Sequence, residues 1–262
     1  MKNRKPAMIV FGLFAALAAL AGPRNAGPPK IDAAVLVSAD AEWSAVRSLH
    51  PHERYETSPF GQYFYQDVTL LDRQVCRLLV FHGGWGKVAA AASTQYVIDR
   101  WDPALIVNLG TCGGFEGAVE RYAIILAAKT VIYDVVERMG NPEEAIADYS
   151  TTIDLGWLEG PDPPGVRRGV LVSADQDAAP ASIALLKSKY GAAAVDWESG
   201  AIAFIARRNK KRILILRGVT DVVGQKGDET YGHIEIFRRN TEIVMKQLFT
   251  NLPLWLLRVR KD

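Results

Sequence analysis

The segment Ala104-Leu105-Ile106-Val107-Asn108-Leu109-Gly110-Thr111-Cys112-Gly113-Gly114 joins an uncharged apolar run directly to a cluster of glycines. A short apolar run of this kind is typical of a strand that is buried on both faces of a sheet. The glycines after it lack a Cβ, so a ligand can approach the backbone closely. We therefore expect a central strand at residues 104–108 with a binding edge at its end.

Strands and helices alternate on both sides of this segment. An apolar strand at residues 33–37 precedes a polar turn and a helix at 41–49, and the glycine-rich stretch 82–86 precedes a helix at 87–101. Neither glycine cluster matches the phosphate-binding loops of nucleotide-binding proteins. The alternation predicts a single three-layer α/β domain, with a central, mostly parallel (mixed) β-sheet flanked by helices.

The rest of the domain continues this alternation. Residues 141–164 are punctuated by proline and glycine, which predicts a long loop with little regular structure. The apolar tail at 252–257 leaves three alternatives open: packing on its own domain, joining an interface or dipping into a membrane surface. Residues 63–72 and 74–81 are expected to form a hairpin, with further strands at 123–128, 130–133, 169–173, 192–195 and 212–217, and helices at 182–190, 198–208 and 231–249.

The first thirty residues differ in kind from the rest. Lys2, Arg4 and Lys5 form a basic head, residues 7–21 are apolar, and Ala19-Leu20-Ala21 is a small-x-small triplet. This layout is typical of a secretory signal peptide, and the run is short of the ~20 apolar residues that span a bilayer comfortably. We expect a signal peptide and tether at 1–30 and an exported domain at 31–262, with an uncleaved N-terminal membrane anchor as the alternative.

Composition narrows the class of protein. The 262 residues include 31 Lys+Arg and 29 Asp+Glu, a net charge of +2. The basic residues are scattered, so a nucleic-acid partner is not expected. Cys76 and Cys112 cannot supply a disulfide framework or a four-cysteine zinc site, although in an exported protein they could pair with each other. His82 and His233 have no companion at metal-ligand spacing, so no metal or cofactor is expected.

Three acidic residues stand just after predicted strands. They are Glu42, Glu198 and Asp221. In open α/β sheets ligands bind beyond the carboxyl ends of the strands, so these three side chains are candidates for one site. Taken singly, each also fits an ordinary helix cap, first-turn acid or solvated surface residue.

Five blocks of sequence together resemble the nucleoside phosphorylase and nucleosidase superfamily, and most closely the methylthioadenosine/S-adenosylhomocysteine nucleosidases. The likeness extends over about residues 31–249 and implies that superfamily's fold. It also implies a homodimer in which the neighbouring subunit contributes apolar residues to the site, and a small-molecule nucleoside substrate without a cofactor. The blocks, in chain order, are Glu42, 84–90, 108–114, 195–203 and 217–222.

The resemblance implies a role for each acid in cleaving an N-ribosidic bond through an oxocarbenium-like sugar. Asp221 is similar to the acid that protonates N7 of a purine, a role that needs a carboxyl group whose pKa is raised by burial. Glu198 resembles the residue that binds the ribose 2′ and 3′ hydroxyls, and Glu42 the base that activates water. The substrate is expected to contact Gly110, Thr111, Gly113, Trp197, Glu198 and Thr220.

The acceptor of the sugar is expected to be water. Phosphorylases need a cation for phosphate, and no Arg lies among residues 35–42 or 106–114, while Arg217 is a candidate for a structural ion pair. A phosphate-dependent phosphorylase and a non-catalytic nucleoside-binding protein remain the alternatives. Asp177 stands where the nucleosidases have an aromatic residue that stacks on adenine. The base and the 5′ substituent therefore stay open.

Overall fold

The computed structural model describes residues 27–224, 227, 230 and 232–259. The signal-peptide prediction falls on residues 1–30, of which 1–26 lie outside the described residues, and the exposed residues 27–30 lead into the first strand. Within the described part, no helix is long and apolar enough to cross a bilayer.

The strands and helices alternate as the sequence predicts. The strands are β1 (Ala33–Val37), β2 (Glu56–Thr57), β3 (Gln62–Thr69), β4 (Val75–His82), β5 (Leu105–Phe115), β6 (Ile124–Ile132), β7 (Ser150–Thr152), β8 (Val166–Ser173), β9 (Ala192–Asp196) and β10 (Arg212–Val223). The helices are α1 (Asp40–Leu49), α2 (Gly86–Trp101), α3 (Pro142–Asp148), α4 (Pro180–Tyr190), α5 (Ser199–Arg208) and α6 (Ile234–Leu257).

The central strand β5 organises the sheet, as expected, but it is longer than predicted. It continues through Gly110, Gly113 and Gly114, so these glycines are strand residues and not a turn after the strand. Its first half pairs with β1, and at Gly113 and Gly114 it pairs instead with β9. Its other edge pairs with β10 along the whole length. A side chain at Gly114 would meet Val119 and Val219 at 2.6 and 2.8 Å, so only glycine fits the close packing there.

Part of the sheet closes into a ring, which the sequence did not predict. Strands β5, β10, β6, β8 and β9 form a ring, because β9 returns to pair with β5. The closures β10–β6 and β9–β5 are antiparallel, and so is the β2–β3–β4 meander on the other side of β1. The sheet is therefore mixed, with a larger antiparallel share than the alternation of elements suggested.

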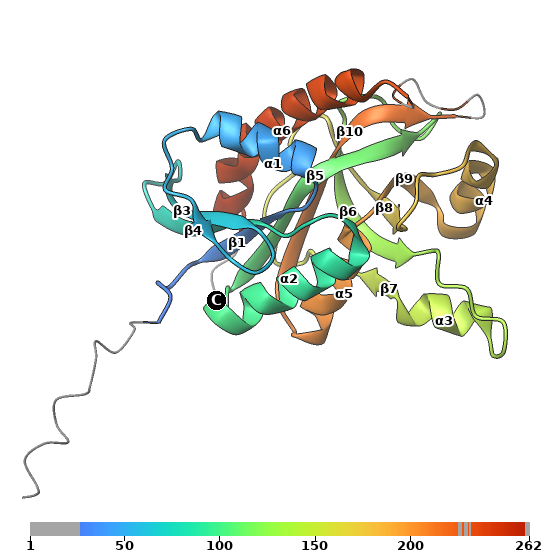
Figure 1. Cartoon of the computed structure of the whole chain (residues 1–262), viewed down its shortest axis with the longest axis horizontal. Helices are drawn as coiled ribbons and strands as arrows, with labels where there is room; N and C mark the ends of the chain where they lie inside the picture. Colours follow the sequence, from blue (N-terminus) through green and yellow to red (C-terminus); the bar gives the residue numbers. More distant parts are fainter. Residues whose placement is uncertain (1–26, 225–226, 228–229, 231, 260–262) are drawn as a thin grey trace, which may run out of the picture.

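Helices cover the sheet on both faces, as predicted. Helices α1 and α6 contact each other on one face, and α2 and α5 contact each other on the opposite face (Figure 1). The buried residues of β1, β4, β5 and β10 form the main core between these helix pairs. The strand pairing brings the end of β9 and the last residues of β10 beside the second half of β5. The first turns of α1 and α2 and the start of α5 lie there too, because Glu42 accepts a hydrogen bond from Thr111 and the Gly86 N–H donates one to Glu198.

The prediction of a long irregular loop at residues 141–164 is wrong in its first part. That stretch contains α3 and β7. Asn141 begins α3 by accepting a hydrogen bond from the Glu143 backbone N–H at 3.0 Å, and Pro142 occupies the first turn, where its missing N–H costs nothing. The proline and asparagine that suggested a loop are thus the residues that start a helix.

The apolar tail belongs to the domain. Helix α6 extends past the predicted end and continues through Pro253 to Leu257. Leu252, Trp255 and Leu256 are buried in the main core, which is the first of the three alternatives left open by the sequence. Leu254 on the other face remains 38% exposed.

We expect Trp255→Ala to lower the free energy of unfolding by about 3–5 kcal/mol, because it removes a large side chain from a packed core. The matched variant Leu254→Ala, on the exposed face of the same helix, should cost less than about 1 kcal/mol. Urea denaturation of the two variants measures the difference. Equal effects would mean that this end of α6 is not held by the core.

Candidate functional site

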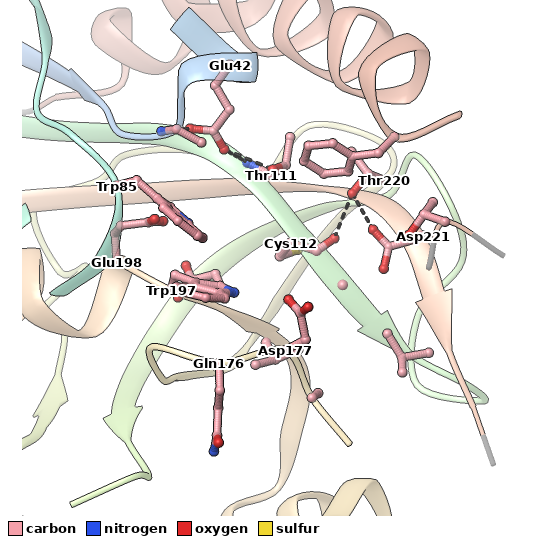
Figure 2. Close-up of a pocket in the computed structure, with 18 of the residues that line it drawn as sticks. Glu42, Trp85, Thr111, Cys112, Gln176, Asp177, Trp197, Glu198, Thr220 and Asp221 are labelled. Carbon is pink, nitrogen blue, oxygen red and sulfur yellow. Dashed lines mark hydrogen bonds between the residues drawn. The ribbon is translucent and has the colours of Figure 1, made fainter. Parts of the chain in front are cut away.

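A cavity of about 480 Å³ lies beside the second half of β5, where β9 and β10 finish (Figure 2). Its volume is in the range of small-molecule sites. All three predicted acids line it. The other predicted contact residues that line it are Thr111, Gly113, Trp197 and Thr220, whereas Gly110 is not among its described lining residues.

Arg217 stands behind this cavity and is completely buried. Its guanidinium lies 3.5 Å from Glu42 Oε1 and 3.4 Å from Glu198 Oε2. It also donates hydrogen bonds to the Thr111 carbonyl at 3.2 Å and to Asn108 Oδ1 at 3.0 Å. The ion-pair role expected of Arg217 is confirmed, and the guanidinium ties α1, β5, β10 and the start of α5 together.

A third carboxylate around this guanidinium, that of Asp196, was not predicted as a site residue. Asp196 Oδ2 lies 3.0 Å from Arg217 Nε, close enough for an ion pair although the two groups are not aligned as a hydrogen bond. Asp196 Oδ1 accepts from Ser173 Oγ at 2.5 Å and from the Ser199 N–H at 3.3 Å. Its position at the end of β9, two residues before Glu198, is the signal that could have identified it.

Glu42 is held by hydrogen bonds on both carboxylate oxygens. Oε2 accepts from the backbone N–H groups of Ser38 and Ala39, at 3.3 and 3.1 Å, which caps the start of α1. Oε1 accepts from Thr111 N at 2.6 Å and Thr111 Oγ1 at 2.9 Å (Figure 2). With Arg217 added, the roughly four lone-pair positions of a carboxylate are all in use. Glu42 is buried and is not a solvated helix residue.

Gly110 has a different role from the predicted one. A Cβ at this position would lie 2.2 Å from Arg217 Nη1 and 2.7 Å from Glu42 Oε1. The close approach that requires glycine is therefore the approach of the protein's own ion pair, and not that of a ligand.

Glu198 occupies the N-cap position of α5, but its side chain makes no capping hydrogen bond. It points instead to Arg217 and accepts from the Gly86 N–H at 3.2 Å. Burial, opposed by Arg217 and reinforced by the nearby Glu42 and Asp196 carboxylates, raises the pKa of Glu198 to about 8. A carboxyl group with this pKa exchanges its proton near neutral pH, which is typical of functional sites.

The turn that carries Gly86 is fixed by a second, smaller charged group. Lys87 pairs with Asp134, and its backbone N–H donates to Asp175 Oδ1 at 2.7 Å. The Asp175 N–H in turn donates to Asp134 Oδ2 at 3.1 Å. The glycine cluster before α2 forms a turn, in which Gly86 adopts a φ of +83°. This network holds the turn against the segment after β8 and so aims the Gly86 N–H at Glu198.

Asp221 reaches the cavity through a bulge. In the pairing of β10 with β5, Val219 faces Cys112 but Asp221 faces Gly113, so Thr220 is the extra residue. Bulges redirect side chains and are frequent beside active sites. Thr220 Oγ1 lies 2.5 Å from Asp221 Oδ1, and the Thr220 carbonyl accepts from Asn240 on α6 at 2.8 Å. A Cβ at Gly113 would lie 3.0 Å from Asp221 Oδ2, so this carboxyl also needs a glycine beside it.

Two tryptophans form one wall of the cavity. Trp85 and Trp197 stack with their ring centroids 4.5 Å apart and an angle of 28° between the rings. Trp85 is 62% exposed, so it is not a core residue. Asp177 also lines the cavity, and its carboxylate points inward while the Gln176 side chain points away (Figure 2). Position 177 thus lacks the aromatic residue of the nucleosidases, while Trp85 before α2 and Trp197 after β9 bring a pair of indole rings to the cavity.

The charged side chains among the described lining residues are all acidic. No Lys, Arg or His is among the residues that the structure describes around the cavity. In the described part of the chain no three His, Cys, Asp or Glu side chains are arranged so that they could hold a metal ion, and Cys76 and Cys112 are not joined in a disulfide. The carboxyl groups that line the cavity are those of Asp40, Glu42, Asp177, Asp196, Glu198 and Asp221.

Comparison with known proteins gives the family. Residues 34–250 match the phosphorylase superfamily, and the chain belongs to it. The predicted superfamily is therefore confirmed over nearly the whole described domain, and so is the α/β fold expected from it.

Three similar proteins are named as nucleosidases of 5′-methylthioadenosine. The 5′-methylthioadenosine/S-adenosylhomocysteine nucleosidase of Thermotoga maritima is 28% identical over 166 residues, which are 63% of this chain and 72% of the relative. The same-named protein of Psychromonas ingrahamii is 23% identical over 197 residues, 67% of this chain and 82% of the relative. The solved structure of Arabidopsis thaliana 5′-methylthioadenosine nucleosidase is similar at a TM-score of 0.69 and 20% identity, covering 89% of this chain and 98% of that chain.

The raised pKa of Glu198 predicts a pH-dependent stability. The folded protein holds a proton on Glu198 up to a pKa of about 8, against an ordinary value of 4.5, so wild-type stability should fall as pH rises between these values. Glu198→Gln carries no such proton. Between pH 5 and pH 8 the melting temperature of Glu198→Gln relative to wild type should therefore rise by more than about 2 °C.

The exposed variant Glu120→Gln serves as the control, and its difference from wild type should stay constant with pH. Differential scanning calorimetry at several pH values measures both. A constant difference for Glu198→Gln would show that Glu198 is already ionised at pH 5.

Proposed function

We propose that the protein hydrolyses the N-ribosidic bond of a purine nucleoside of the methylthioadenosine/S-adenosylhomocysteine type, which gives the free base and a ribose sugar. One observation carries the proposal. The carboxyl groups of Glu42, Glu198 and Asp221 converge on one cavity whose described lining contains no cation. Relatives and similar structures named as such nucleosidases support the substrate class.

The arrangement can perform the reaction with balanced proton transfers. Asp221 gives its proton to N7 of the purine as the bond from C1′ to N9 breaks, and the bonding electrons leave with the base. The oxygen of water forms the new bond to C1′, and the proton of that water passes to Glu42. The protons on Glu42 and Asp221 are then exchanged through solvent, which restores the starting state.

Glu198 and its neighbours stabilise the positive charge that develops on the sugar. The buried cluster holds three carboxyl groups, those of Glu42, Asp196 and Glu198, against one guanidinium. A cationic sugar next to this cluster favours the ionised form of Glu198, so the interaction is stronger in the transition state than with the neutral substrate. The Glu198 carboxyl group also binds the ribose hydroxyls.

The attacking water reaches Glu42 by replacing a hydrogen-bond donor to this carboxylate that can rotate away. Four of the groups that contact Glu42 are backbone N–H groups or the buried Arg217 guanidinium. The fifth is the Thr111 hydroxyl, which also lines the cavity. If this hydroxyl rotates away, the attacking water takes its place as a donor to Glu42 Oε1 and the buried ion pairs stay as they are.

Water is the acceptor because the described residues of the site offer no free cation for phosphate. Arg217 is already surrounded by three carboxylates, and Lys87 is paired with Asp134. A phosphate dianion placed beside these carboxylates would be repelled and would lack a counterion. The described residues therefore favour hydrolysis over transfer of the sugar to phosphate.

The purified protein should release free adenine and free sugar from methylthioadenosine in phosphate-free buffer, as measured by chromatography with mass detection. Asp221→Asn cannot donate the proton and should lower kcat at least about 100-fold while substrate binding is retained. A sugar 1-phosphate formed only with phosphate would establish a phosphorylase. Binding without any product would establish a binding protein.

We also propose that the protein is exported and forms a homodimer. Exposed apolar side chains at Val88, Val136 and Met139 lie on two segments that the Lys87–Asp134 ion pair joins, which supports an interface beside the cavity. Sedimentation of the purified protein would contradict the dimer if it gave the mass of one chain. Fractionation of cells should find the domain outside the cytoplasm, either released or held by an uncleaved N-terminal anchor.

A further inference from the structure

The indole pair at the cavity has no packing role that explains its position. Trp197 directly precedes Glu198 in the chain, and Trp85 covers one face of its ring. Trp85 itself is largely exposed, and in Figure 2 Trp197 lies between Trp85 and Asp177. A large apolar surface kept at the edge of a polar cavity is typical of a ligand contact.

Near Asp221 the cavity is lined by backbone and by apolar side chains. The floor there is the backbone of Gly113, beside which Val195 and Val223 present methyl groups. The Asp221 carboxyl lies at the same place. A planar base can therefore lie on an apolar floor while its edge meets a carboxyl group.

Asp177 adds a second carboxylate to this end. It lies on the segment after β8, is exposed to the cavity mouth and points inward (Figure 2). The preceding residue, Gln176, turns away and forms a hydrogen bond with the Tyr133 hydroxyl. An ionised carboxylate only accepts hydrogen bonds, so its partner on a ligand must be an N–H or O–H group.

We propose that Trp197, supported by Trp85, is the stacking surface for the substrate base, and that Asp177 accepts a hydrogen bond from an exocyclic amino group at C6 of a purine. The site would thereby select 6-aminopurines over 6-oxopurines. This inference rests on the proposed function, because the role of Asp221 at N7 fixes how the base lies.

The selection follows from the positions of groups on a purine. N7 and the substituent at C6 lie on the same edge of the ring, so a base whose N7 meets Asp221 presents its C6 substituent to the same end of the cavity. A 6-amino group donates to Asp177. A 6-oxo group is an acceptor, and placing it against a carboxylate leaves both acceptors without a donor.

The test is equilibrium binding of the free bases adenine and hypoxanthine, measured by isothermal titration calorimetry and by quenching of tryptophan fluorescence. Wild-type protein should bind adenine at least about tenfold more tightly than hypoxanthine. Asp177→Asn supplies both a donor and an acceptor and should reduce this preference to about twofold or less. Trp197→Leu should weaken both bases about tenfold, as expected for the loss of base stacking.

Trp85→Leu tests the stacking surface a second time. Because Trp85 is 62% exposed, its replacement should leave the fold intact, and it should weaken the binding of both bases by a smaller factor than Trp197→Leu does. Two matched controls lie outside the cavity. Asp72→Asn replaces an exposed turn carboxylate, and Tyr149→Leu replaces an exposed aromatic residue stacked on Phe204. Both controls should bind as wild type does.

Absence of adenine binding to the wild type, or a base preference that Asp177→Asn leaves unchanged, would overturn the inference. Unchanged affinity in both tryptophan variants would do the same. These outcomes are distinct from those that test the proposed function, because hydrolysis is measured from its products and the base preference is measured from the binding of free bases. A protein that discriminates the bases as described but forms no product would contradict only the hydrolase.

Discussion

The burial of Arg217 among three carboxyl groups is the interaction on which the rest of the site depends. An unpaired guanidinium in this position would be prohibitively costly, and so would each carboxylate without it. The requirement for mutual neutralisation brings α1, β9 and β10 together at one point. It also explains why Gly110 has no side chain, since the guanidinium lies over its backbone. The same ion pairs that neutralise the buried charges therefore also hold Glu42 and Glu198 at the cavity.

The sequence indicates much of this site because its acids follow strands whose ends must meet. Glu42, Glu198 and Asp221 do line one cavity, as their positions predict. Asp196 also stands at the end of a strand, but its role could not be predicted, because only the structure shows that its carboxylate lies 3.0 Å from Arg217. The bulge that turns Asp221 inward could not be seen either, since a one-residue change of register depends on the partner strand.

Local sequence patterns predicted the strands and helices better than they predicted which strands pair in the sheet. Apolar runs give β1 and β10 clearly, since each is buried on both faces. They do not show that β9 returns to β5 and closes a ring, because closure depends on contacts between residues distant in the chain. The Asn-Pro pair before α3 illustrates a related ambiguity, since the same residues that end regular structure also begin helices.

Strands inside and outside the closed ring should differ in how well they tolerate insertions and deletions. The ring consists of β5, β10, β6, β8 and β9. Adding or removing a strand within the ring would alter its circumference and move every group that faces the cavity. Strands β2 and β3 lie outside the ring, because β3 pairs with β4 and β4 is separated from β5 by β1. Insertions and deletions during evolution should therefore accumulate in the meander, while the ring keeps its strand number in descendants whose substrates have diverged.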